Sequence, residues 1–155
     1  MLHMTTFFIF AAKYLIALPV LILGVYFLMK PWREQKNMML FAIPAALFAY
    51  VLALIAGHLY FDPRPFVVGH FTPLIPHAAD NGFPSDHTLL ASALAAIGMY
   101  WNRRLGLSLW TIAAIIAVAR VYVGVHHTID VVGSMLIALA GTAAWHAAYR
   151  RFLQK

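Results

Sequence analysis

The stretch from Arg120 to Asp130, RVYVGVHHTID, places a cation, two imidazoles and a carboxylate close together in the chain. His126 and Asp130 are four residues apart, so they share a face if the next helix starts near His126. A carboxylate there can keep one imidazole nitrogen protonated and leave the other free to attack. Arg120 lies inside an apolar span, where a cation is costly and usually functional. The pattern predicts a histidine nucleophile beside an arginine. A buried Arg–Asp pair with interfacial histidines is the structural alternative.

A second polar stretch, PSDH at Pro84–His87, stands at the start of an apolar segment. Ser85 or Asp86 is a good N-cap for a helix that begins there. The free N–H groups and the positive dipole end of a first helical turn attract phosphate, and Ser85 adds a hydroxyl donor. His87 can then donate a proton to a leaving oxygen. The alternative is a helix cap with a histidine at the membrane interface.

Arg64 supplies a third piece, because the stretch DPRPF at 62–66 holds it between two prolines. Proline stiffens the backbone on both sides of the arginine, and a fixed guanidinium suits a phosphate. An arginine that reaches lipid headgroups from a turn is the alternative. Together the three stretches predict one site that binds and transfers a phosphate.

The composition of the 155 residues is that of a membrane protein. Hydrophobic residues make up 63% and charged residues 10%, whereas soluble domains are about half apolar and a quarter charged. The net charge of +6 is gathered in short clusters rather than spread as an even basic coat, so we expect no nucleic-acid partner. Because the chain has no cysteine, disulfides and thiolate metal sites are excluded.

We predict an all-α integral membrane helical bundle that forms one domain over residues 1–155, with about five transmembrane helices. A span needs roughly 20 apolar residues. The candidates are Phe7–Met29, Met38–Phe61, Thr88–Trp101, Leu105–Val125 and Val131–Tyr149. Thr88–Trp101 is short for a span. We count it as a transmembrane helix because the spans before and after it require the chain to cross the membrane between them. Pro44 predicts a kink in the second span. The first segment lacks the basic start of a cleaved signal peptide. Residues 67–83 could form a lid or a short interfacial helix.

Basic residues orient the predicted bundle. Five crossings bring eight of them to one face, namely Lys30, Arg33, Lys36, Arg103, Arg104, Arg150, Arg151 and Lys155. The positive-inside rule makes that face cytoplasmic, so we expect the C-terminus in the cytoplasm and the N-terminus outside. Four of the five acidic residues and most of the histidines then share the outer face. A passive anchor has no need of such an arrangement.

Three signatures resemble those of the type 2 phosphatidic acid phosphatase superfamily, which includes the vanadium haloperoxidases. They are RP at Arg64–Pro65, PSDH at Pro84–His87 and R-x5-H-x3-D at Arg120–Asp130. PRPFV, FPSDHT and VGVHH-x2-DV are most similar to the bacitracin-resistance branch of undecaprenyl-pyrophosphate phosphatases, which recycle the cell-wall carrier lipid. The sequence departs from the family where a lysine usually opens the first signature and a serine precedes the last arginine. Gly57 and Ala119 stand at those positions.

The resemblance implies a phosphatase that hydrolyses the terminal phosphate of a polyprenyl (undecaprenyl) pyrophosphate through a phosphohistidine, without metal or cofactor. His126 would attack phosphorus, Asp130 would orient His126, and His87 would protonate the leaving oxygen. The phosphate-binding residues would be Arg64, Arg120 and Ser85. Lys13 either supplies the missing cation or extends to outer headgroups. His127 is the rival nucleophile, although its spacing fits the signature less well.

The resemblance further implies a lipid phosphate substrate in the bilayer, with the site on the periplasmic or exterior side of a bacterial cytoplasmic membrane. Phosphatidylglycerophosphate, phosphatidate or lipid A phosphate are alternative substrates. A zinc enzyme is a second alternative, but no H-E-x-x-H pair occurs. A non-enzymatic lipid transporter or assembly subunit is a third. Asp62, Asp80 and Asp86 would repel a polyanion unless they are screened or set aside, and no protein partner is predicted.

Overall fold

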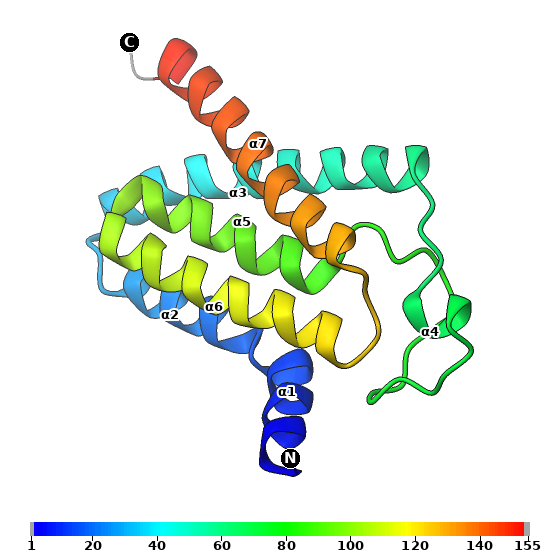
Figure 1. Cartoon of the computed structure of the whole chain (residues 1–155). Coiled ribbons are helices and arrows are strands. Elements are labelled where there is room, and N and C mark those ends of the chain that lie inside the picture. The colour runs from blue at the N-terminus through cyan, green and yellow to red at the C-terminus, as the bar shows by residue number, and fades with distance from the viewer. Residues whose placement is uncertain (1, 154–155) are drawn as a thin grey trace.

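The computed structural model describes residues 2–153, and every regular element in that range is a helix. The elements are α1 (Leu2–Tyr14), α2 (Ala17–Leu28), α3 (Trp32–Leu59), α4 (Pro65–Val68), α5 (Asp86–Trp101), α6 (Arg103–Tyr122) and α7 (Thr128–Leu153). α5 lies at the centre and packs against α2, α3, α6 and α7 (Figure 1). The predicted all-α class is confirmed.

The first predicted span, Phe7–Met29, is wrong as a single helix. α1 and α2 are separated by a short break and bent by 51°. Pro19 is the physical reason, because proline has no N–H and its ring collides with the carbonyl of the residue four earlier, here Leu15. Instead the Leu18 N–H donates to Leu15 O at 3.0 Å, which closes a tighter turn. The bend leaves α1 free to pack against α6.

The other predicted spans correspond to single helices, and α3 continues without a break through Pro44. Three helices, α3, α6 and α7, are long and apolar enough to cross a membrane, and α1 with α2 gives a fourth if the bent pair is one span. α5 has 16 residues. At 1.5 Å per residue it is about 24 Å long, shorter than the roughly 30 Å hydrocarbon core. Five crossings therefore stay a prediction.

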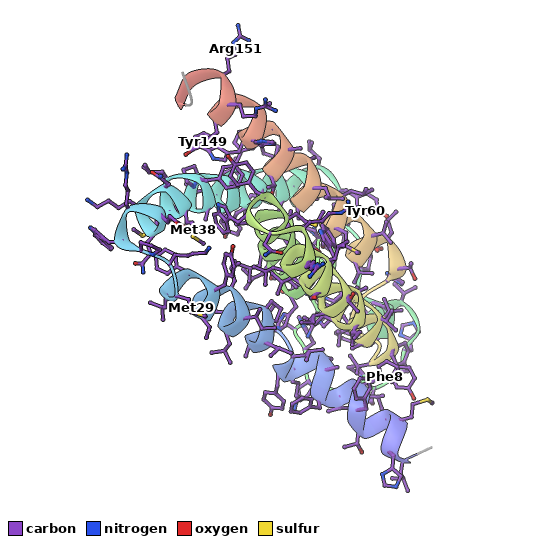
Figure 2. The ribbon with its side chains drawn as sticks, turned by 90° about the vertical axis from the view of Figure 1, so that its left-hand side faces the viewer. Phe8, Met29, Met38, Tyr60, Tyr149 and Arg151 are labelled. Carbon is purple, nitrogen blue, oxygen red and sulfur yellow. The ribbon has the colours of Figure 1, made fainter. Side chains whose placement is uncertain are left out.

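Small residues line the contact between α3 and α7. Ala45, Ala49 and Ala53 follow one face of α3 and are at most 4% exposed. A Cβ on Gly141 of α7 would lie 2.6 Å from the Ala49 Cα, so the two backbones are in direct contact. Large apolar side chains cover the outside instead, including Met29 near the end of α2 (Figure 2). This distribution suits a protein surrounded by lipid.

The connections between the helices lie at the two ends of the bundle. The α2–α3 link and the α5–α6 turn lie at one end, and the long α3–α5 connection and the α6–α7 turn lie at the other (Figure 1). The α3–α5 connection contains α4, which covers only four residues, so residues 67–83 form a loop with little helix. All three predicted signatures meet at this second end, which we call the site end.

Candidate active site

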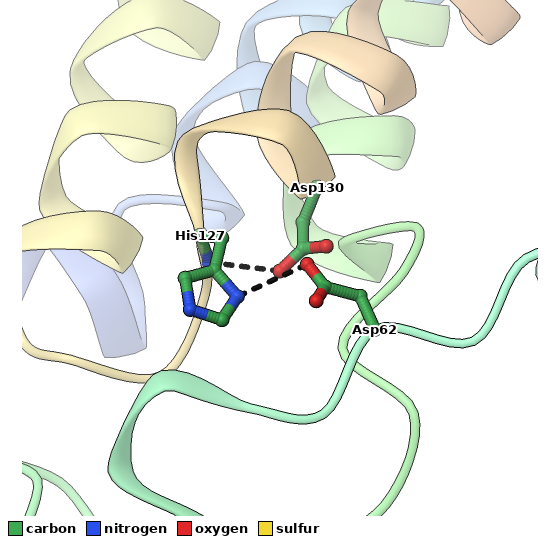
Figure 3. A group of neighbouring side chains, drawn as sticks. All are labelled: Asp62, His127 and Asp130. Carbon is green, nitrogen blue, oxygen red and sulfur yellow. Dashed lines mark hydrogen bonds and ion pairs between the residues drawn. The ribbon is translucent and has the colours of Figure 1, made fainter. Parts of the chain in front are cut away.

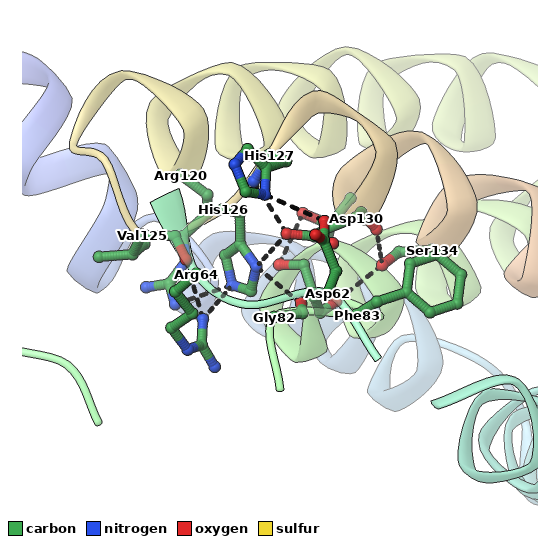
Figure 4. A network of polar contacts seen from close by, with 12 residues as sticks. Asp62, Arg64, Gly82, Phe83, Arg120, Val125, His126, His127, Asp130 and Ser134 are labelled. Carbon is green, nitrogen blue, oxygen red and sulfur yellow. Dashed lines mark hydrogen bonds and ion pairs between the residues drawn. The ribbon is translucent and has the colours of Figure 1, made fainter. Parts of the chain in front are cut away.

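His126 lies in the turn between α6 and α7 and is 3% exposed. Its Nε2 is 3.3 Å from Nη1 of Arg64 and 3.3 Å from Nη2 of Arg120. A guanidinium can only donate, so Nε2 is the acceptor and carries no proton. Nδ1 carries the proton instead and donates to Gly82 O at 2.9 Å and to Asp130 Oδ2 at 3.3 Å. The free electron pair of His126 therefore points at two cations (Figure 4).

The electrostatic setting keeps His126 neutral. Burial lowers the pKa of His126 below its usual value, and the positive charges of Arg120 and Arg64 lower it further. The hydrogen bond with Asp130 acts in the opposite direction but does not outweigh these effects. The ring is therefore unprotonated at neutral pH, as a nucleophile must be.

The turn that carries His126 depends on Gly124, whose φ of 81° is in the left-handed region that glycine adopts readily. The helix α6 ends at Tyr122, just before this glycine. The shared helix face required the next helix to start near His126. Because α7 begins at Thr128, after His126, the histidine and Asp130 do not lie on one helix face. Their contact is made from the turn. The backbone N–H of His127 also donates to Asp130 Oδ2, at 2.8 Å, which fixes the carboxylate.

Arg64 is held in the site and does not extend to lipid headgroups, since it is 5% exposed. Its Nε donates to Asp80 Oδ1 at 2.7 Å, Nη1 to Val125 O at 2.9 Å, and Nη2 to Asn81 O at 3.2 Å. Burial raises the pKa of Asp80, but the hydrogen bond and the charge of Arg64 outweigh it and leave that pKa below its usual value. The carboxylate of Asp80 is thus paired rather than facing a ligand alone.

Arg120, near the C-terminal end of α6, is 3% exposed. Its Nη1 donates to Ala12 O of α1 at 3.3 Å, and its Nη2 contacts His77 Nε2 at 3.0 Å as well as His126. Its Nε is buried and has no hydrogen-bond partner within residues 2–153. Arg120 therefore keeps a donor that a bound anion could use.

Ser85 occupies the N-cap position of α5 as predicted, but its side chain does not cap the helix. The hydroxyl is fully buried and accepts a hydrogen bond from Thr88 Oγ1 at 3.3 Å, which turns it away from the capping geometry. Asp86 is the exposed first residue of α5. His87 follows it, and within the described chain its ring has no hydrogen-bond partner. Burial, and after it the charge of Arg120, lowers the pKa of His87 to about 4.

The structure does not join Lys13 to this group. Its side chain is exposed, and in the part of the chain described here no hydrogen bond or ion pair connects it to the arginines or histidines. Gly57 stands where the first signature usually has a lysine, and the space that such a side chain would need is occupied by the backbone of another segment. A Cβ on Gly57 would lie 3.0 Å from Phe83 O and 3.2 Å from Pro84 Cδ. A side chain at this position would have to displace the segment that leads into α5.

Sequence reasoning missed Asn81, which connects the loop to α3. Its Nδ2 donates to Gly57 O at 2.9 Å and to Tyr60 O at 3.1 Å. Its Oδ1 accepts from the backbone N–H groups of Asp62 at 2.9 Å and Phe83 at 3.0 Å. One amide thereby ties the end of α3 to the segment before α5. An asparagine followed by glycine signals only a turn, so the sequence offered no hint of this role.

His127 is paired with Asp62 rather than with the arginines, through Nδ1 and Oδ2 at 3.0 Å (Figure 3). Burial and the neighbouring Asp130 carboxylate raise the pKa of Asp62. Possible ligand atoms of Asp62, His127 and Asp130 all lie within 4.8 Å of one another, so these residues could hold a metal ion. Pairing with Asp62 distinguishes His127 from His126, whose free nitrogen faces two guanidinium groups.

Residues 37–153 match the family model of the PAP2 superfamily, the type 2 phosphatidic acid phosphatases. The chain is 35% identical over 131 residues to "Undecaprenyl-diphosphatase BcrC" of Bacillus subtilis (strain 168), a match that covers 84% of this chain and 67% of the relative. It is 33% identical over 152 residues to "Putative undecaprenyl-diphosphatase YbjG" of Escherichia coli (strain K12), covering 95% of this chain and 76% of the relative.

The fold is similar to the crystal structure of Aquifex aeolicus LpxE, with a TM-score of 0.71 and 22% sequence identity over 93% of this chain and 84% of the other. The resemblance expected from the three signatures is confirmed by the family match and by the two curated relatives. The apolar helices agree with an integral membrane protein. This chain therefore belongs to the PAP2 superfamily and is a membrane lipid phosphatase.

Proposed function

We propose that this protein hydrolyses the terminal phosphate of a polyprenyl pyrophosphate, undecaprenyl pyrophosphate, through a phosphohistidine on His126. The observation that carries the proposal is the convergence of the Arg64 and Arg120 guanidinium groups on the unprotonated Nε2 of His126. The choice of lipid is supported by two relatives, which are named "Undecaprenyl-diphosphatase BcrC" and "Putative undecaprenyl-diphosphatase YbjG".

The terminal phosphate binds between the two guanidinium groups and the first turn of α5. Arg120 contributes the Nε–H that has no partner among residues 2–153, and the free N–H groups of the α5 N-terminus face the same charge. Ser85 fixes the start of that turn through its contact with Thr88. Lys13 is assigned to outer headgroups, because it is exposed and has no contact with the arginines.

Transfer proceeds in two steps. Burial lowers the pKa of His87 to about 4 in the free site, so His87 takes up a proton from solvent when the negative charge of the phosphate enters. His126 Nε2 then forms a bond to phosphorus while the bridging P–O bond breaks, and His87 gives that proton to the departing lipid phosphate oxygen. Asp130 stabilises the positive charge that develops on His126. His87, now neutral, takes a proton from water, which attacks phosphorus and breaks the P–N bond. Inorganic phosphate and the lipid monophosphate are the products. Phosphoryl transfer depends mainly on positioning and charge stabilisation, and two arginines supply both without a metal.

An apolar groove beside the site supports a lipid tail. Its volume is about 640 Å³, and it is lined by Tyr60, Phe83, Thr128, Ile129, Val132, Gly133 and Leu136. Thr128 also lines the more polar hollow that reaches His126 and His127. A substrate with its phosphate at His126 and its chain along the outer side of α7 would occupy both.

We propose that the site faces the periplasm or exterior of a bacterial cytoplasmic membrane. The exposed Arg103 and Arg104 lie at the opposite end of the bundle, which the positive-inside rule assigns to the cytoplasm. Because the chain has no cysteine, single cysteines can report the orientation. A membrane-impermeant maleimide added to intact cells should label Ala79→Cys and leave Arg104→Cys unlabelled. The reverse pattern would refute this orientation.

The substrate is tested by phosphate release from the purified wild-type protein. Undecaprenyl pyrophosphate should be hydrolysed with a higher kcat/KM than phosphatidylglycerophosphate, phosphatidate or lipid A phosphate. A preference for one of these would keep the lipid phosphatase and change its substrate. A wild-type protein that releases phosphate from no lipid in the panel would contradict the proposal and favour a transporter.

A further inference from the structure

His77 is an imidazole of the site that the proposed reaction does not use. It lies on the loop between α4 and α5 and is partly buried. Its Nε2 is 3.0 Å from Nη2 of Arg120, and its ring centroid is 6.0 Å from that of His126. The loop therefore brings a further histidine to the space where the phosphate would bind.

The contact with Arg120 fixes the protonation of His77 in the substrate-free site. Arg120 can only donate, so His77 Nε2 accepts and carries no proton. His77 Nδ1 is then protonated and lies 3.4 Å from Ala78 O. The two N–H groups of Arg120 Nη2 thus point at two imidazoles, those of His77 and His126.

A phosphate oxygen that binds Arg120 Nη2 must displace one of these imidazoles. His126 is 3% exposed and is held through Nδ1 by Gly82 and Asp130. His77 is less buried, and within residues 2–153 its one other hydrogen bond is the long contact to its neighbour Ala78. The phosphate oxygen therefore displaces His77 from Arg120 and leaves His126 in place.

Among the described residues, no lysine joins the two arginines of the site. The family lysine is replaced by Gly57, where a side chain would meet the backbone at Phe83, and Lys13 has no contact with the site. The Arg64 guanidinium is already paired with Asp80. A terminal phosphate carries up to two negative charges near neutral pH, so a third donor beside Arg120 would add to its binding.

We propose that His77 is a substrate-binding residue of this phosphatase: when phosphate takes its place on Arg120, His77 gains a proton on Nε2 and donates it to a phosphate oxygen. The proton comes from solvent, and no bond to phosphorus changes. The proposal rests on the proposed function, because it uses the same phosphate position between Arg64 and Arg120.

The groups that face His77 give this contact a pH dependence. They are Arg64 before α4, Arg120 on α6, His126 in the α6–α7 turn, His87 on α5 and Asp80 on the same loop. In the free site, burial, then Arg64 and Arg120, lower the pKa of His77. A phosphate beside the ring adds negative charge and raises that pKa. The protonated His77 therefore strengthens phosphate binding. This gain in affinity is complete at pH values below the pKa of His77 in the free site, and it is lost as pH rises through the pKa of His77 in the phosphate complex.

The experiment compares wild type, His77→Gln and His77→Lys. The inhibition constant of inorganic phosphate and the KM of the lipid are measured from acid to alkaline pH. Loss of one charge-assisted hydrogen bond should weaken both constants about tenfold in the Gln variant at about pH 5.5, with kcat little changed. The difference should vanish by about pH 9, where the wild-type histidine is neutral. His77→Lys should keep the tight binding across the range, since lysine stays charged to about pH 10.

Three results would overturn the proposal. The first is a Gln variant whose inhibition constant and KM equal those of wild type at every pH. The second is a loss of affinity in the Gln variant that does not change with pH. The third is tighter phosphate binding in the Gln variant, which would mean that His77 competes with phosphate for Arg120. Failure of the proposed function looks different, because the wild type would then release no phosphate from any lipid. Calorimetric titration with inorganic phosphate would still test His77 in that case.

Discussion

The two ends of the bundle both contain a buried or half-buried histidine, but they use it differently. At the site end, His126 is bonded to two arginines, a carbonyl and a carboxylate, all with little exposure. At the opposite end, His146 packs edge-on against aromatic rings, with centroids 4.9 Å from Tyr100 and 6.1 Å from Phe41. The basic residues there, such as Arg104, are exposed.

The difference separates a region built for stability from one built for chemistry. Aromatic packing around Phe41, which is 1% exposed, stabilises the fold through close contacts between the rings, since lipid tails are as apolar as these side chains. Burying Arg64, Arg120 and Asp130 costs desolvation free energy, which hydrogen bonds to other groups, among them His126, offset only in part. A membrane protein that keeps such a network at one end only is expected to use it for binding or catalysis.

The largest effect is expected for His126→Gln. Without the attacking nitrogen the phosphohistidine cannot form, so kcat should fall by roughly 10⁴-fold or more. His146→Gln is the control, because it removes a half-buried histidine from the opposite end of the bundle and should keep near-normal activity. Phosphate release and acid-labile labelling with a radioactive substrate measure both. Equal loss in the two variants would mean that the histidines act through folding.

Removal of one guanidinium should have the next largest effect. Arg120→Gln deletes a positive charge that faces the phosphate, and we expect kcat/KM to fall by about 10²–10³-fold. Arg104→Gln, an exposed arginine at the other end, should change kcat/KM by less than about twofold. If Arg120→Gln were as active as its control, the phosphate would bind elsewhere.

The same variant should move the pH profile. His126 must be unprotonated to attack, so activity is lost as pH falls through its pKa. In wild type, burial and the charges of Arg120 and Arg64 hold that pKa below 6.5, which places the acid limb of kcat/KM below this pH. Loss of the Arg120 charge raises the pKa of His126, so the acid limb of Arg120→Gln should shift to higher pH. A shift to lower pH would contradict the assignment of His126 as the nucleophile.

A smaller effect is expected for His127→Gln. His127 pairs with Asp62 through its side chain but holds Asp130 through its backbone N–H, which glutamine keeps. We expect kcat to fall by about tenfold or less, as for the loss of one supporting contact. The ratio of the His126→Gln and His127→Gln losses therefore identifies the nucleophile, and a larger loss at His127 would reverse the assignment.

Much of the fold could be predicted because its determinants are local. Apolar runs placed four helices within a few residues, and the spacing of Arg120, His126 and Asp130 marked the site. The break between α1 and α2 was not predicted, because Pro19 blocks the carbonyl four residues before it and so breaks the helix away from its own position. The roles of Asn81 and His77 were out of reach, since their partners lie far away in sequence and only the packed loop brings them together.

Chelation of metal ions should have the smallest effect on activity. It tests whether the site end differs from the opposite end only in its buried charges or also in holding a metal ion. Asp62, His127 and Asp130 are close enough to hold an ion. However, Asp130 Oδ2 already accepts hydrogen bonds from His126 and His127, and His127 Nδ1 is paired with Asp62. This leaves Asp130 Oδ1, which has no hydrogen-bond partner among residues 2–153, as the one unpaired oxygen of that carboxylate. The two arginines supply the positive charge that a metal would bring. Activity in EDTA should therefore equal that in buffer. If EDTA abolished activity in wild type, and added Mg²⁺ or Zn²⁺ restored it there but not in Asp62→Asn, this cluster would be a metal site.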